Sequence, residues 1–163
     1  MTRPGIATVC CLLAVAATGC GVRPTGVTDG GSAPSGISQG MRVYFASDSG
    51  PRGVSRPDAT LHDLNAAFKL LLAGPTPDER AAGLANLLPR GEAFSATSRQ
   101  GKVTVNAPGQ YFGPQDQSTG QLVCTIARAE VLLHGTRPDK VQVTIVGADG
   151  SAGPYQCQQF LSR

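Results

Sequence analysis

The chain contains few residues that could carry chemistry, and the cysteines come first among them. Five cysteines and two histidines occur in 163 residues. A thiol can bind a metal, join a second thiol in a disulfide or accept a covalent modification, so the surroundings of each cysteine decide its chemistry. Cys10, Cys11 and Cys20 lie in the N-terminal stretch, whereas Cys124 and Cys157 lie in the body of the chain.

The N-terminal stretch has the pattern of an export signal. Arg3 supplies a positive charge, and the apolar run 6–17 is too short to span a bilayer. Small residues precede Cys20, which resembles a bacterial lipobox, although Ala17 stands where that pattern prefers leucine. The resemblance implies a signal peptide of residues 1–19 and a lipid on Cys20 that anchors the protein at the extracytoplasmic face of the cell membrane. The alternative is an ordinary cleavable signal that leaves Cys20 as a spare thiol.

The two remaining cysteines form an even pair in a chain that we expect to be exported. We therefore expect a disulfide between Cys124 and Cys157, worth about 4 kcal/mol in the chain-entropy model. Two buried free thiols are the alternative. A metal site is not expected, because the other soft ligands are His62 and His134, and the spacing of Cys124 and His134 places them on different faces of one helix.

Catalytic motifs are absent from the sequence. No Gly-x-Ser-x-Gly elbow, H-E-x-x-H pair or Walker A loop occurs. We expect His62 in the first turn of one helix and His134 in the last turn of another, where structural roles are favoured. Glu130 lies one helical turn before His134, a helical pair of little energetic weight. We therefore expect no catalytic residue, no cofactor and no enzymatic activity.

Composition limits the remaining possibilities. Only 15% of the residues are charged, and tryptophan is absent, so Leu, Val, Ile and Ala must build the core. The net charge of +3 is spread singly along the chain, which argues against a nucleic-acid partner. Residues 20–40 are rich in Gly, Ser and Pro and predict a flexible tether. Residues 41–163 are long enough for a single domain.

The first part of that domain predicts a strand and a helix. Residues 41–46 are rich in β-forming residues, turn signals follow over 47–51, and we expect a loop over 50–57. Apolar residues then recur at helical spacing over 61–72, with Asp58 or Thr60 as the expected start.

The stretch that follows contains strong helix stop and start signals. Gly74 and Pro75 end the first helix. Thr76 can accept the backbone N–H of Glu79 while the Glu79 carboxylate reaches back, which predicts a short second helix beginning at Pro77. An exposed corner of this kind could also serve as a partner surface.

The second part predicts a hairpin, a long helix and a strand. Alternating residues over 92–99 and 102–106 flank a Gln-Gly turn, and residues 141–145 alternate in the same way. Residues 117–134 have helical periodicity with apolar residues on two sides, so this helix needs two neighbours. We expect the sheet on one side and the C-terminal tail, held by Cys157, on the other.

These elements predict an α+β fold. We expect one sheet of about four strands with two long helices on one face. The expected order is β-α-(short α)-β-β-α-β, followed by a C-terminal tail pinned by the disulfide.

The arrangement also resembles a known domain. A leucine-rich helix, the stretch LLAGPTPDERAAGL, a leucine–proline–glycine exit and a two-strand segment are similar to the GerMN domain. That domain occurs in spore-germination and sporulation proteins and in envelope lipoproteins of high-GC Gram-positive bacteria. The resemblance covers about 43–150 and implies that residues 41–163 form a GerMN-like domain. Asn106 and Ala107 stand where the family usually has an Asp-containing turn.

The resemblance implies a function without catalysis. Its relatives help to assemble envelope or sporulation complexes, or modulate sensor kinases from outside the membrane. We therefore expect a membrane-anchored module that binds or scaffolds envelope proteins. The alternative is a solute- or peptidoglycan-binding lipoprotein, which would need a concave pocket lined by polar groups.

Overall fold

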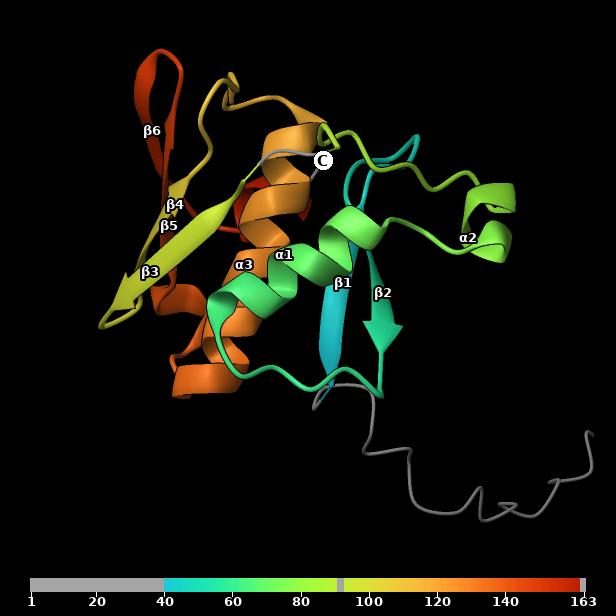
Figure 1. The fold of residues 1–163 in the computed structure, drawn as a ribbon, viewed down its shortest axis with the longest axis horizontal. Coiled ribbons are helices and arrows are strands. Elements are labelled where there is room, and N and C mark those ends of the chain that lie inside the picture. The colour runs from blue at the N-terminus through green and yellow to red at the C-terminus, as the bar shows by residue number, and fades with distance from the viewer. Residues whose placement is uncertain (1–39, 91–92, 162–163) are drawn as a thin grey trace, which may run out of the picture. The chain divides into compact units, whose positions relative to one another are not determined.

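The computed structural model describes residues 40–90 and 93–161. Figure 1 shows its helices and strands along the chain. They are β1 (Met41–Phe45), β2 (Arg52–Arg56), α1 (Leu64–Ala73), α2 (Pro77–Ala81), β3 (Ser95–Arg99), β4 (Lys102–Asn106), α3 (Gln117–His134), η2 (Pro138–Lys140), β5 (Gln142–Gly147), β6 (Gly150–Tyr155) and α4 (Gln158–Leu161). None of the helices in the described ranges is long and apolar enough to cross a membrane.

A four-stranded mixed sheet confirms the predicted α+β class. Its order is β3-β4-β5-β6, and β4 and β5 are parallel while the outer pairs are antiparallel. Parallel neighbours need a crossover connection, and α3 provides it between β4 and β5. Helices α1 and α3 lie on the same side of this sheet, contacting β3 and β5 respectively (Figure 1).

The first strand lies outside that sheet, contrary to the prediction of a single sheet. β1 pairs instead with β2 in a separate two-stranded sheet, and β2 occupies the segment that the sequence predicted as a loop. The other edge of β1 faces α3. There the Thr125 hydroxyl accepts the Tyr44 N–H at 2.9 Å, and the Gln121 side chain donates to the Tyr44 carbonyl at 3.4 Å. Side chains of a helix therefore occupy the edge where another strand would pair.

Helix α3 is the centre of the core. It contacts β1 on one side and β5 on the other, and α1 also packs against it (Figure 1). Almost every side chain between Thr119 and Glu130 is buried, as the two-sided apolar pattern predicted. The hydrophobic core residues with no exposed surface in the described part of the chain are Val43, Phe45, Ala67, Leu71, Val105, Ala107, Leu122, Val123, Ile126, Ala129, Val143 and Ile145.

The short helices show what the cap signals could and could not predict. The capping box of α2 is confirmed, with Thr76 and Glu79 bonded reciprocally and Pro77 as the first helical residue. Helix α1 begins later than predicted, because Asp63 is its N-cap and accepts the Ala66 N–H at 2.8 Å. His62 consequently lies before the helix and not in its first turn.

The C-terminal tail contains regular structure that the sequence did not predict. It forms β6 along β5 and then the single-turn helix α4. Phe160 of α4 is buried against α3 at Gly120, where a Cβ atom would lie within 3.0–3.1 Å of the Phe160 side chain. The tail therefore covers the N-terminal half of α3.

Candidate functional site

The structure joins the two cysteines that the sequence paired. Cys124 and Cys157 form a disulfide with an S–S distance of 2.04 Å and a Cα–Cα distance of 4.5 Å. The bond links α3 to the residue just before α4, so the predicted staple between the tail and the outer face of α3 is confirmed. Cys20, the predicted lipid-attachment residue, lies outside the described residues.

The histidines do not form a reaction centre in the described part of the chain. His134 is in the last turn of α3, and its Nδ1 lies 2.7 Å from Oε2 of Glu130. Glu130 is only 1% exposed, so the carboxylate of this pair is buried, whereas the His134 side chain is 53% exposed. The other carboxylate oxygen accepts the Thr136 hydroxyl at 3.0 Å. The buried carboxylate therefore holds the end of α3 and the following turn together.

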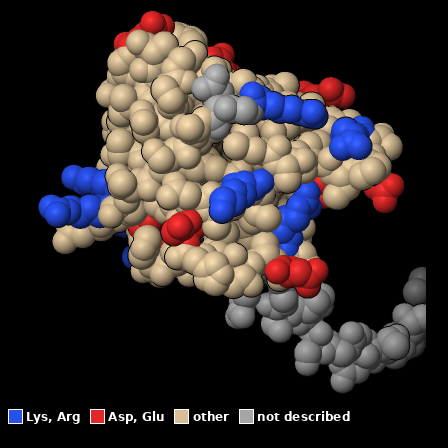
Figure 2. Space-filling view, in the orientation of Figure 1, with Lys and Arg blue, Asp and Glu red and all other residues tan. Residues whose placement is uncertain are grey.

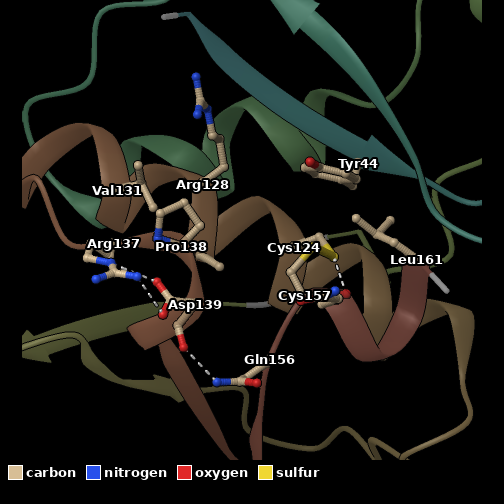
Figure 3. A pocket seen from close by; sticks show the side chains of 12 residues that line it. Tyr44, Cys124, Arg128, Val131, Arg137, Pro138, Asp139, Gln156, Cys157 and Leu161 are labelled. Atoms are coloured by element: carbon tan, nitrogen blue, oxygen red, sulfur yellow. Dashed lines mark hydrogen bonds and ion pairs between the residues drawn. A yellow bond between two sulfur atoms is a disulfide. The ribbon is translucent and has the colours of Figure 1, made fainter. Parts of the chain in front are cut away.

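A groove lies beside the disulfide on the outer face of α3, and we call it the α3 groove. Its volume is about 610 Å³, which is within the range of ligand pockets. Figure 3 shows its walls, with Tyr44 of β1 and Leu161 of α4 across from Val131 and Pro138. The lining residues are Tyr44, Cys124, Ala127, Arg128, Val131, Arg137, Pro138, Asp139, Gln156, Cys157, Gln158 and Leu161.

The floor of the groove is the part of α3 that the tail leaves uncovered. Cys124, Ala127 and Val131 lie one and two turns apart on one face of the helix. The disulfide and Phe160 cover this face only as far as Cys124. The sequence predicted an apolar face here and a tail to cover it, but it contained no signal for where the cover would end.

Arginines stand at the rim of the groove. Arg128 donates to the carbonyl of Gly40 at 2.8 and 3.1 Å, which holds the start of β1 beside α3. Arg137 forms an ion pair with Asp139 at 3.1 Å, and Gln156 donates to the Asp139 carbonyl at 3.0 Å (Figure 3). The lining thus combines an apolar floor with two guanidinium groups and one carboxylate, a composition suited to binding.

Metal chemistry finds no support in the described residues. No group of three or more His, Cys, Asp or Glu side chains lies close enough to hold an ion among residues 40–90 and 93–161. Charged side chains are scattered over the face seen in Figure 2, and most of that face is uncharged.

Comparison with known proteins places the chain in a family. The family model Germane, described as sporulation and spore germination, matches residues 42–150, well over half of the 163 residues. No curated protein and no solved structure matches the chain. The region that matches the family model includes α3 and Tyr44, which line the groove. Cys157 and α4 lie beyond the end of the matched region. The chain belongs to the Germane (GerMN) family of sporulation and spore-germination domains.

Proposed function

We propose that the protein is a lipoprotein anchored through Cys20 at the extracytoplasmic face of the cell membrane. Its Germane domain acts there without catalysis, as a module that binds or scaffolds envelope proteins. The finer roles that we propose are the assembly of an envelope or sporulation complex, or the modulation of a sensor kinase, in a high-GC Gram-positive bacterium. The α3 groove is the observation that carries the proposed binding role.

The chemistry of the groove supports binding more than reaction. Its one carboxylate, Asp139, is paired with Arg137 and lies 3.7 Å from the Lys140 ammonium. Its histidine-free lining offers no general base beside a nucleophile. Apolar side chains on three elements instead face a common space, and they lose contact with water when a partner fills it.

The rim charges indicate the chemistry of the partner. The Arg137 side chain is 76% exposed and its ion pair with Asp139 is a surface pair, so a carboxylate of the partner can bond to this guanidinium. The floor requires an apolar side chain beside that charge. We therefore take the occupant to be a segment of an envelope protein that carries apolar residues next to Asp or Glu.

The wall supplied by α4 would give this chain its own selectivity. Gln156, Gln158 and Leu161 line the groove but lie beyond the family match. A partner seated against them would contact residues that the matched region does not include.

Site-specific photo-crosslinking in living cells tests the proposal. A photoreactive amino acid replaces Leu161, which is 47% exposed in the groove, or Leu87, which is 51% exposed and outside its lining. We expect an adduct from position 161 and none from the matched position 87. Sequencing of the captured peptide should show an apolar residue within a few positions of Asp or Glu. An adduct from both positions, or a captured segment that is basic, would refute the assignment of the groove.

The anchor needs a separate experiment. Cys20→Ser removes the acceptor of the lipid while the domain stays unchanged. We expect the variant to leave the membrane fraction and appear in the medium, whereas unchanged membrane retention would disprove anchoring through Cys20.

A further inference from the structure

A second hollow lies at the opposite end of the tail, where the loop after β4 meets the β5–β6 turn. We call it the Tyr111 hollow. Its volume is about 200 Å³, smaller than the pockets of about 300–1,000 Å³ that hold drug-sized ligands. The residues that matter here are Gln110, Tyr111, Asp149, Ser151 and Tyr155. A space of this size suits one ring-sized group.

Tyr111 is presented to solvent on a fixed backbone. Its side chain is 68% exposed, one of the few large apolar side chains exposed in the described part of the chain. The loop that carries it is bonded to the sheet on both sides, by Ala107 N–H to the Val146 carbonyl at 2.8 Å and by Ala148 N–H to the Gln110 carbonyl at 2.9 Å. An exposed aromatic ring on a backbone held by hydrogen bonds can serve as a contact surface for a ligand.

The polar groups around the ring have no hydrogen-bond partner in the described part of the chain. The side chains of Gln110, Asp149 and Ser151 and the hydroxyls of Tyr111 and Tyr155 make no hydrogen bond to another described residue. Burial, with Tyr111 and Asp116 nearby, raises the pKa of Tyr155, so its phenol stays neutral and can both donate and accept. Donors and acceptors that no other described side chain engages therefore surround the hollow.

The types of these groups narrow the ligand class. No Lys or Arg lines the hollow, so a phosphate or a carboxylate would meet no positive charge and would face Asp149. A sugar ring suits the same set, because its C–H face can lie on the negative face of an aromatic ring while its hydroxyls bond to a carboxylate, an amide and a hydroxyl.

We propose that the Tyr111 hollow binds one neutral sugar ring of a glycan strand. Tyr111 supplies the stacking face, Asp149 accepts hydrogen bonds from ring hydroxyls, and Gln110 and Ser151 complete the polar contacts. The site is independent of the α3 groove, since the two hollows share no lining residue.

Titration with the N-acetylglucosamine tetramer and sedimentation with purified peptidoglycan test this site on residues 20–163. We expect saturable binding of the tetramer, which shifts of the NMR amide resonances around Tyr111 measure. We also expect the protein to co-sediment with peptidoglycan. Tyr111→Ala should weaken both by about tenfold, the loss of one aromatic contact. The affinity of Tyr111→Phe for the tetramer should stay within about twofold of that of the native protein, because stacking is retained. Asp149→Asn should bind the tetramer more weakly than the native protein.

The controls separate this site from the proposed protein-binding groove. Leu87→Ala and Leu161→Glu should leave binding of the tetramer unchanged, and circular dichroism checks that every variant is folded. Equal binding by Tyr111→Ala and the native protein would overturn the proposal, as would failure to bind both glycans. Crosslinking of position 111 to a protein, without glycan binding, would also overturn it.

Discussion

At the scale of single residues, Glu79 caps helix α2 and also binds Arg56, and the sequence predicted only the first of these contacts. Its carboxylate accepts the Thr76 N–H at 2.9 Å, as the capping box predicted. It also accepts hydrogen bonds from both terminal nitrogens of Arg56, at 2.6 and 2.7 Å. The spacing of Thr76 and Glu79 is local and can be read from the chain, whereas Arg56 is brought near only by the pairing of β2 with β1.

The pH dependence of stability should report this contact. The Arg56 hydrogen bonds lower the pKa of Glu79 below its ordinary value of 4.5. The stabilisation is therefore complete above about that pH and is lost as the pH falls through the lowered pKa. We expect Glu79→Gln to reduce the free energy of unfolding by about 1 kcal/mol at pH 7.

Urea unfolding of Glu79→Gln and the native protein at a series of pH values measures the effect. The difference should vanish in strong acid. Asp78→Asn is the control, because Asp78 is an exposed acid in the same turn. An equal loss in both variants would assign the effect to the helix dipole and not to Arg56.

Glu130 shows the limit of residue-level inference more clearly. The four-residue spacing to His134 predicted a helical pair, but it could not show that α3 is enclosed by sheets on two sides and that Glu130 is buried with both oxygens bonded. Spacing along one helix cannot reveal what lies against it. The Tyr111 hollow could not be predicted for the same reason, because its lining residues come from a loop and a hairpin that are far apart in sequence.

At the scale of elements, strong periodicity predicted α3 and the β3–β4 hairpin, because their own patterns decide their structure. No comparable pattern marks β2 or β6 along the chain. The β2 sequence RGVSR has a single large apolar residue, and β6 contains Gly150, Gly153 and Pro154. Pairing with β1 and β5 makes them strands, so tertiary contacts override local propensity.

Gly120 provides a test of how closely α4 packs on α3. Glycine within a helix normally costs about 1 kcal/mol relative to alanine. Here a Cβ would lie 2.6 Å from Pro51 Cγ and 3.0 Å from the Phe160 ring. We therefore expect Gly120→Ala to destabilise the protein by about 1–3 kcal/mol, because overpacking outweighs helix propensity.

The urea midpoint of Gly120→Ala distinguishes the two effects by their sign. A lower midpoint with an unchanged slope supports the tight contact between the helices. A higher midpoint would mean that helix propensity dominates and that the tail is loosely held.

At the scale of the whole molecule, the disulfide ties the C-terminal tail to the central helix. The bond spans 33 residues, so the chain-entropy model assigns it about 4 kcal/mol. The double variant Cys124→Ser, Cys157→Ser should lose about 2–4 kcal/mol of unfolding free energy. The free energy of unfolding of the native protein in reductant should approach that of the variant. Reductant should not change the stability of the variant itself.

The same bond shapes the α3 groove. Cys124 contributes to its floor and Cys157 to its wall. The even number of cysteines in a chain that we expect to be exported predicted the pairing. The depth of the groove depends on the path of β6 and α4, which the sequence did not indicate. A stability loss below about 0.5 kcal/mol in the double variant would show that the tail is held by packing alone.

The central claim is that the uncovered part of α3 is where the protein binds its partner, and filling the groove tests it most directly. Val131→Trp places a large ring on the floor, and Leu87→Trp places the same ring on an exposed position elsewhere. The measurement is the yield of the partner adduct from formaldehyde-treated cells that contain equal amounts of each folded variant. We expect Val131→Trp to lose the adduct and Leu87→Trp to retain it. A full yield of adduct from Val131→Trp would contradict the account.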